Sequence, residues 1–409
     1  MVNTETITTI NYLRSTQAIR DRCHELFDLC LQDRLTHFTC NLNALDNVAG
    51  YVIDHINIAY PDWQIPFHSR WRHFQAGGVD RLTPLSQKLA DLSAIEQARS
   101  QFDLAVTSVL LDAGSGSDWC YHEAETGQVF RRSEGLAVAS YHLFVSGGFS
   151  HLGIPQADAI GLQNLSLEQL ATGFQVTAAN PLVGIEGRLS LMQQLGASVA
   201  AQPDLFGADS RPGGLVDYLF TQTQAGQLSA HQVLEAVLQG FSEIWPGRLT
   251  IEGVNLGDVW VHSALPDRGL ASQWVPLHKL SQWLTYSLLE PLQQLGITIT
   301  ELDRLTGLAE YRNGGLLIDL GLLQPKHEAV LGSAHLPSSE VIVEWRALTV
   351  VLLDRIADRI RQILDRSAEA LPLAKILEGG TWAAGRRIAA ERRSGGVPPI
   401  QVISDGTIF

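Results

Sequence analysis

The densest group of side chains able to bind a small anion lies in the segment 66–74, PFHSRWRHF. It mixes imidazole, guanidinium and aromatic groups, among them His68, Arg70 and His73, and such a mixture suits a small anionic or planar ligand. A guanidinium group offers phosphate a planar fork of donors, and an indole ring offers a stacking face. The alternative is a loop held by aromatic packing with solvated arginines. The residues leave both interpretations open.

Carboxylates set among apolar neighbours mark three further positions. Asp112 follows the apolar run 102–111 and precedes a Gly/Ser-rich turn that ends at Trp119, as in a binding pocket. Glu310 and Glu344 interrupt largely apolar stretches. A carboxylate in such surroundings is costly unless it is paired or used in chemistry. For Asp112 the simpler alternative is a cap on the next element.

Cationic residues accompany two of these carboxylates. Lys279 begins an apolar helical segment and is a candidate partner for Glu310, while Arg346 lies two residues after Glu344. An internal ion pair is the simpler interpretation of each case. The further residues that we predict to contact substrate are Tyr311, Arg312, Glu344 and Arg346. A basic group near the C-terminus is read as a solvated face or a phosphate clamp; it comprises Arg386, Arg387, Arg392 and Arg393.

Composition limits the possible functions. The 409 residues carry 29 Lys+Arg against 43 Asp+Glu, a formal charge of −14, and 45% are hydrophobic. This excludes a disordered chain and a small disulfide scaffold, and it argues against a nucleic-acid polymer as partner. P-loop, GxGxxG, HExxH and CxxC motifs are absent, so we predict no cofactor and no metal. We expect a cytoplasmic protein with a small nucleotide-like substrate and no membrane contact; the oligomeric state stays open.

Helical periodicity dominates and predicts a mainly α fold with a small β element. We expect an N-terminal helical region, 1–175, which carries the aromatic loop 60–78, and a C-terminal helical region, 176–409, or one continuous unit. Gly196 is predicted to end a helix, Pro291 to kink or break one, and the pair Gly314–Gly315 to separate two short helices. The other expected elements are helices over 102–111, 135–145, 231–241 and 341–363, a Ser166–Gln169 capping box, and a strand with an internal turn over 249–262.

Five motifs resemble one family over essentially the whole chain. They are HSRWRHF (68–74), LLDAGSGSDW (110–119), RSEGLAVAS (132–140), LTGLAEYRNGGLLIDLG (305–321), and GTWAAGRRIAAE (380–391) with SDGT (404–407). They are similar to the uracil catabolism protein four / uracil-regulated gene three family of fungi and bacteria. That resemblance implies a role in a pyrimidine-degradation route that ends in urea, without giving the step.

A weaker resemblance runs through the second half. The segments 181–196, 276–284, 305–312 and 340–350 look, in the same order, like parts of the queuosine-salvage nucleotide N-glycosylases. Those enzymes are helical, related to DNA glycosylases, and hydrolyse the N-glycosidic bond of a nucleoside 5′-phosphate. Their pattern carries a lysine and an aspartate at the positions of Lys279 and Glu310, and here glutamate stands in place of aspartate.

Together the two resemblances imply an N-glycosidase acting on a ring-opened uracil nucleotide, ribosylurea 5′-phosphate. Glu310 would then stabilise the oxocarbenium-like transition state and Lys279 would assist it. Two other classes stay open. One is an amide or ureide hydrolase acting on a pyrimidine-derived intermediate, and the other is a non-catalytic nucleotide-binding regulator.

Overall fold

The computed structural model describes residues 4–245 and 248–403, so the SDGT motif at 404–407 lies outside the described residues. The chain folds into two compact units. Unit 1 is formed by residues 4–68, 248–282 and 301–403, and unit 2 by residues 69–245 and 283–300. These units interleave along the sequence, whereas the regions predicted above, 1–175 and 176–409, are continuous and stay a prediction.

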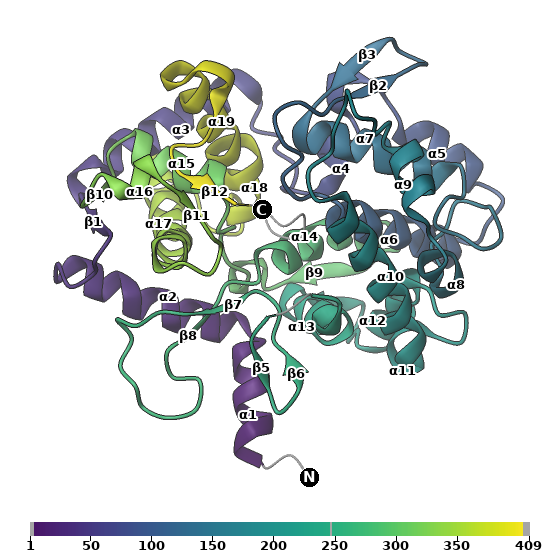
Figure 1. Cartoon of the computed structure of the whole chain (residues 1–409), viewed down its shortest axis with the longest axis horizontal. Helices are drawn as coiled ribbons and strands as arrows, with labels where there is room; N and C mark the ends of the chain where they lie inside the picture. The colour runs from purple at the N-terminus through teal and green to yellow at the C-terminus, as the bar shows by residue number, and fades with distance from the viewer. Residues whose placement is uncertain (1–3, 246–247, 404–409) are drawn as a thin grey trace. The chain divides into compact units, whose positions relative to one another are not determined.

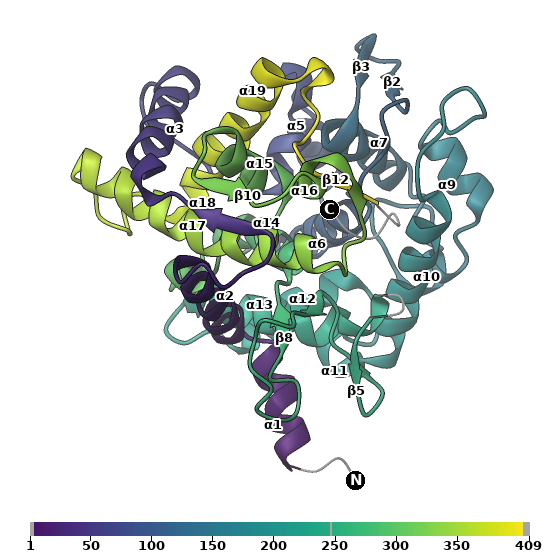
Figure 2. The ribbon, with the colours of Figure 1, turned by 60° about the vertical axis from the view of Figure 1, so that its left-hand side comes forward.

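Unit 1 is built around the long helix α17 (Glu340–Leu364). This helix packs against α2, α3 and α15, and Figures 1 and 2 both draw α2 beside it. Its other helices are α1 (Thr4–Leu13), α2 (Thr16–Leu31), α3 (Leu45–Ala59), α15 (Tyr311–Asp319), α16 (Ala329–Gly332), α18 (Leu373–Ile376) and α19 (Trp382–Arg392). Its strands are β1 (Phe38–Cys40), β5 (Thr250–Ile251), β6 (Val254–Asn255), β7 (Val259–Val261), β8 (Trp274–Pro276), β10 (Leu323–Pro325), β11 (Ala334–His335) and β12 (Gln401–Val402).

Unit 2 is also helical, with α6 and α10 at its centre. The β2–β3 hairpin stands on α7, as Figure 1 shows. The helices are α4 (Arg70–His73), α5 (Leu82–Lys88), α6 (Ala94–Leu110), α7 (Arg132–Val145), α8 (Ala159–Gln163), α9 (Leu167–Gly173), α10 (Ile185–Ala201), α11 (Pro203–Phe206), α12 (Leu215–Thr221) and α13 (Ala230–Phe241). The strands are β2 (Tyr121–Glu123), β3 (Gln128–Phe130), β4 (Gln227–Ser229) and β9 (Thr298–Thr300). Helix α14 (Lys279–Gln294) belongs to unit 1 up to Gln282 and to unit 2 from Trp283.

The predicted fold class is confirmed, because helices dominate and each sheet in the described part of the chain has two strands. The Ser166–Gln169 capping box is present at the start of α9. The strand expected over 249–262 forms the β5–β6 hairpin and then β7, which pairs with β8. Among the described residues, no helix combines the length and apolarity needed to cross a membrane.

Three glycines predicted to end or break helices lie inside them instead, so those predictions are wrong. Gly196 is within α10, where a Cβ would come within 2.8 Å of the Ala159 carbonyl oxygen of α8. Gly314 and Gly315 are within α15, where a Cβ would meet the Trp345 ring at 2.6 Å and the Pro399 ring at 3.0 Å. Glycine is needed at these positions for close packing of helices and not for a turn.

Pro291 also fails to break its helix, because α14 continues to Gln294. A proline has no N–H to donate to the carbonyl four residues earlier, which here belongs to Ser287. The indole N–H of Trp71 donates to that carbonyl at 2.7 Å. Trp71 lies in α4, a helical turn inside the segment 60–78 that the sequence predicted to be a loop. An external donor therefore replaces the hydrogen bond that proline removes.

If Trp71 replaces the hydrogen bond that Pro291 cannot make, the effects of mutating these two residues on stability should depend on each other. Trp71→Phe keeps the aromatic packing but leaves the Ser287 carbonyl unsatisfied, which should lower the free energy of unfolding by about 1–3 kcal/mol. In a Pro291→Ala background the new N–H at 291 can occupy the carbonyl, so Trp71→Phe should cost clearly less. Urea denaturation of the four proteins measures this double-mutant cycle, and additive effects would contradict the explanation.

Candidate functional site

Glu310 is the N-cap of α15 and is held by the backbone of the helix it starts. Its Oε2 accepts the Arg312 N–H at 2.6 Å and its Oε1 accepts the Asn313 N–H at 2.5 Å. The residue is 6% exposed. Two backbone hydrogen bonds fix the carboxylate in one orientation, and the helix N-terminus favours its negative charge.

Opposing effects act on the protonation of this carboxylate. Burial raises the pKa of Glu310 above its ordinary value, while the charge of Lys279 and the N–H groups of Arg312 and Asn313 pull it down. Lys279 is itself buried, at the start of α14. Glu310 therefore has the desolvated surroundings and nearby cation that are found at catalytic carboxylates, and that also occur in structural ion pairs.

An ion pair between Asp258 and Arg346 positions both of these residues. Arg346 donates through Nη1 and Nη2 to the two Asp258 oxygens, each at 2.8 Å. Its Nε donates to the Ala309 carbonyl, one residue before Glu310, at 3.0 Å. Asp258 Oδ2 also accepts the backbone N–H of Lys279 at 2.9 Å. Burial alone would raise the pKa of Asp258, but the charge and hydrogen bonds of Arg346 hold it well below its usual range.

Glu344 and Arg346 are close in sequence but have different partners, so the ion pair suggested for them is not what the structure contains. Glu344 is fully buried, and its Oε1 accepts the N–H groups of His37 and Phe38 at 3.1 and 2.7 Å. Its Oε2 lies 3.4 Å from Nε2 of the buried His262. Glu344 thus fixes the start of β1 to α17.

The remaining candidates of unit 1 are engaged in contacts within that unit. Arg312 lies over the Tyr311 ring, 5.0 Å from its centroid, and donates through Nη1 to the Gly396 carbonyl at 2.7 Å. His68 is buried, with Nδ1 2.6 Å from Glu378 Oε2. Its ring packs against Trp382 with the centroids 5.6 Å apart.

Within unit 2 the structure brings Arg70 and Asp112 together. Arg70 is fully buried, 3.1 Å from Asp112 Oδ1, and its Nε donates to Ser108 Oγ at 2.7 Å. Burial lowers the pKa of Arg70 and the charge of Asp112 opposes this effect. The guanidinium also lies over the Trp283 ring at 5.4 Å. Asp112 therefore pairs with a cation, and the alternative that it caps the next element is not needed to explain it.

The two other candidates of unit 2 contact aromatic neighbours. His73 is buried against Trp283, with the ring centroids 5.4 Å apart. Trp119 is fully buried, and its indole N–H donates to the Phe174 carbonyl at 2.9 Å. Trp119 is thus a core side chain whose one donor is already used.

Sequence reasoning missed Arg188, which organises the turn after Asp112. This buried side chain donates to the carbonyls of Leu111 and Ala113 at 3.1 and 2.8 Å, and also to that of Val183. Burial lowers its pKa to about 10. The available signal was that Arg188 is the one cationic residue of the helical segment 181–196. Asp258 and Asn313 were also missed as site residues, although Asp258 lies within the expected strand 249–262 and Asn313 within the motif 305–321.

The C-terminal basic group is partly engaged in ion pairs. Arg393 donates through Nη1 and Nη2 to Asp319, both at 2.6 Å, and Arg387 lies 2.9 Å from Glu391. Arg386 lies over the Trp382 ring, 5.0 Å from its centroid. These contacts agree with the simpler interpretation of a charged helix face.

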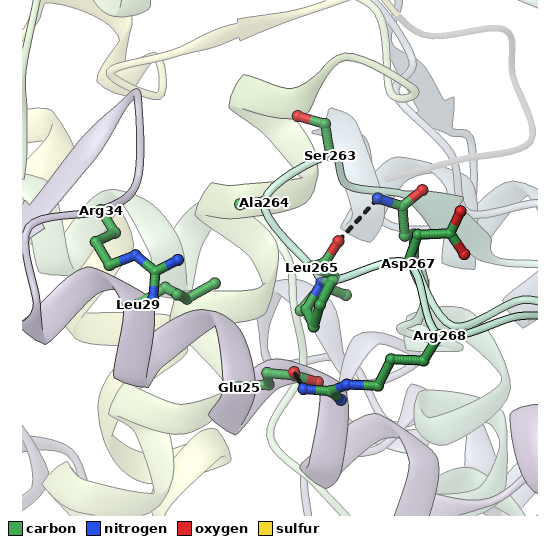
Figure 3. A pocket seen from close by; sticks show the side chains of 10 residues that line it. Glu25, Leu29, Arg34, Ser263, Ala264, Leu265, Asp267 and Arg268 are labelled. Atoms are coloured by element: carbon green, nitrogen blue, oxygen red, sulfur yellow. Dashed lines mark hydrogen bonds and ion pairs between the residues drawn. The ribbon is translucent and has the colours of Figure 1, made fainter.

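A surface pocket of about 460 Å³ lies elsewhere in unit 1. It is lined by Glu25 and Leu29 of α2, by Arg34 shortly after that helix, and by residues of the segment 263–273. Figure 3 shows Arg268 reaching Glu25, and these side chains form an ion pair of 2.9 Å. The pocket lining contains none of the residues predicted from sequence.

The Asp258–Arg346 pair gives a second prediction. Arg346→Met removes the cation and leaves a desolvated carboxylate, so the free energy of unfolding should fall by about 3 kcal/mol. Adding Asp258→Asn removes the uncompensated charge and should restore much of that loss. Urea denaturation measures both, and an Arg346→Met variant as stable as the parent would rule out this role for the pair.

Two known proteins are similar to this chain over nearly its full length. "Uracil catabolism protein 4" of Lachancea kluyveri is 39% identical, over 98% of this chain and 99% of its own length. "Protein urg3" of Schizosaccharomyces pombe is 39% identical with the same coverage of both chains. The resemblance of the five motifs to the uracil catabolism protein four / uracil-regulated gene three family is therefore confirmed.

A protein-family model described as "Protein of unknown function (DUF1688)" matches residues 12–409. Because this match spans almost the full length and the relatives align from end to end, the chain belongs to the DUF1688 family.

Proposed function

We propose that this protein is an enzyme of uracil catabolism that hydrolyses the N-glycosidic bond of ribosylurea 5′-phosphate to urea and ribose 5-phosphate. The names of its two relatives support the pathway. The observation that carries the reaction is Glu310, a buried carboxylate fixed by two backbone N–H groups at a helix N-terminus and influenced by the charge of Lys279.

The reaction needs a stabilised positive charge and a proton for the leaving group. As the C1′–N bond breaks, its electron pair goes to the urea nitrogen and C1′ gains oxocarbenium character. Ionised Glu310 stabilises that charge and takes a proton from the attacking water, whose oxygen bonds to C1′. The urea nitrogen gains one proton and Glu310 releases the proton that it took from water, so the carboxylate is regenerated and the net reaction consumes only water.

The surroundings of Glu310 suit this role because they set both its orientation and its charge. Its two backbone hydrogen bonds already fix the orientation of the carboxylate, so no further conformational entropy is lost when the transition state forms. The charge of Lys279 opposes the effect of burial and favours the ionised form of the carboxylate. Arg346 binds the backbone carbonyl of Ala309, the residue before Glu310, and Asp258 binds the backbone N–H of Lys279.

The assay that tests the proposal is urea release from ribosylurea 5′-phosphate, run beside UMP, uridine and unphosphorylated ribosylurea. Urea from the phosphorylated ureide alone is the expected result. Tight binding of that compound without turnover would contradict the proposal and favour a regulator, and ring opening of an intact pyrimidine would favour an amide hydrolase.

Glu310→Gln should lower kcat by about 10³-fold or more, because it removes the negative charge that the transition state requires. Glu310→Asp restores the charge with a side chain one methylene shorter and should retain part of the activity. The matched control is Asp158→Asn, at a buried carboxylate that caps α8 in unit 2. It should lower the melting temperature but leave turnover within a few-fold, and equal losses in both variants would contradict a catalytic role for Glu310.

Lys279→Met should move the acid limb of the pH–rate profile to higher pH. Lys279 lowers the pKa of Glu310, so removing its charge lets that pKa rise further, and Glu310 then ionises only at higher pH. Lys279→Arg keeps the charge and should leave the limb close to its original position. A uniform loss of rate at all pH values in Lys279→Met would show that Lys279 acts in another way.

A further inference from the structure

The first turn of α15 carries a buried hydrogen-bond acceptor next to Glu310. Asn313 is fully buried, and its backbone N–H is one of the two groups that hold the Glu310 carboxylate. Its side-chain Nδ2 donates to the Leu308 carbonyl at 3.3 Å. This bond identifies the other amide atom, Oδ1, as the acceptor, and Oδ1 has no hydrogen-bond partner among the described residues.

A buried donor lies against the same turn. Trp345 of α17 is 1% exposed, and its indole N–H also has no hydrogen-bond partner in the described part of the chain. A Cβ placed on Gly314, the residue after Asn313, would come within 2.6 Å of Trp345 Nε1. The indole nitrogen is therefore close to the α15 backbone directly beyond Asn313.

Unsatisfied polar atoms of this kind are uncommon in protein interiors because an unmade hydrogen bond leaves the full cost of desolvation. Here one acceptor and one donor both adjoin the helical turn that orients Glu310. A ligand that satisfies both must carry a hydrogen-bond donor and a hydrogen-bond acceptor. A ureido group carries both, as an N–H and a carbonyl on neighbouring atoms.

We propose that Asn313 and Trp345 recognise the ureido leaving group of the substrate, with Asn313 Oδ1 accepting from its terminal NH₂ and Trp345 Nε1 donating to its carbonyl. This inference rests on the proposed function and adds its specificity. The pair selects N-ribosyl ureides and orients the nitrogen whose bond to C1′ breaks.

The test compares two substrates that differ only at the terminal nitrogen, ribosylurea 5′-phosphate and its N′,N′-dimethyl analogue, which has no N–H at that position. We expect the parent enzyme to prefer the ureide with the free NH₂ by roughly 10- to 100-fold in kcat/KM, the effect of one buried hydrogen bond. In Asn313→Ala this ratio should fall toward one.

A matched control is available at Gln282, another fully buried amide of unit 1. Its Nε2 donates to Thr306 Oγ1 at 2.6 Å, and its Oε1 accepts the Thr306 N–H at 3.3 Å. Gln282→Ala should lower the melting temperature and leave the ratio for the two substrates unchanged, because both of its polar atoms already have protein partners.

Trp345→Phe is a second, independent variant. It keeps an aromatic ring against Gly314 and removes only the indole N–H, so the melting temperature should stay the same or rise. We expect kcat/KM for ribosylurea 5′-phosphate to fall by about tenfold. A residue with a purely structural role would not lose activity while keeping or gaining stability.

The outcomes separate this inference from the proposed function. If the parent enzyme cleaves neither ureide, the proposed function fails and the inference with it. If the parent enzyme cleaves ribosylurea 5′-phosphate but does not discriminate, or if Asn313→Ala keeps the ratio or folds and loses both activities, the specificity role is overturned while the glycosidase stands. Unchanged activity in Trp345→Phe would remove the indole from the proposal.

Discussion

The ion pair between Asp258 and Arg346 is the interaction on which unit 1 depends. Among the described residues, four hydrogen bonds converge on the Asp258 carboxylate, two from Arg346, one from the backbone of Lys279 and one from the Trp260 indole at 2.6 Å. Arg346 in turn holds the Ala309 carbonyl. A buried pair contributes to stability only when such additional bonds satisfy its remaining polar atoms. Here these bonds also join four segments distant in sequence, at 258–260, 279, 309 and 346, so that one ion pair positions the backbone at Lys279 and next to Glu310.

Buried charges in this chain are used in more than one way. Glu344 fixes the start of β1 to α17 through two backbone N–H groups, and Arg188 gathers the carbonyls of the turn after Asp112. Both satisfy backbone polar groups of irregular segments that no regular element would satisfy. Glu310 shares the geometry of a backbone-bound carboxylate, and burial raises its pKa while the charge of a neighbouring lysine opposes the rise. This combination is found at catalytic carboxylates and also in structural ion pairs.

Close packing around α15 explains why two glycines, Gly314 and Gly315, come directly after Asn313 in this helix. The Trp345 ring occupies the space where a side chain at 314 would begin, and the Pro399 ring does the same at 315. Glycine costs a helix stability relative to alanine. The close approach it permits places an indole N–H beside the turn that carries Glu310 and Asn313, so a local loss of helix propensity serves the arrangement of polar groups.

The sequence by itself determined the helical class, the family and most helix positions, because periodicity and capping residues act locally. The capping box at Ser166 and the long amphipathic run that became α17 follow from side chains within a few residues of one another. Chemically distinctive residues such as Glu310 and Lys279 were also visible, since a charge in an apolar stretch stands out.

Only the tertiary structure decided which groups meet. Arg346 pairs with Asp258 and not with Glu344, two residues away, because side chains two positions apart on a helix point in different directions. Pro291 remains inside α14 because Trp71, 220 positions earlier in the chain, supplies the missing donor. Gly196, Gly314 and Gly315 stay helical because neighbouring elements pack against them. In each case the deciding contact joins residues that are distant in sequence, and no local pattern encodes such a contact.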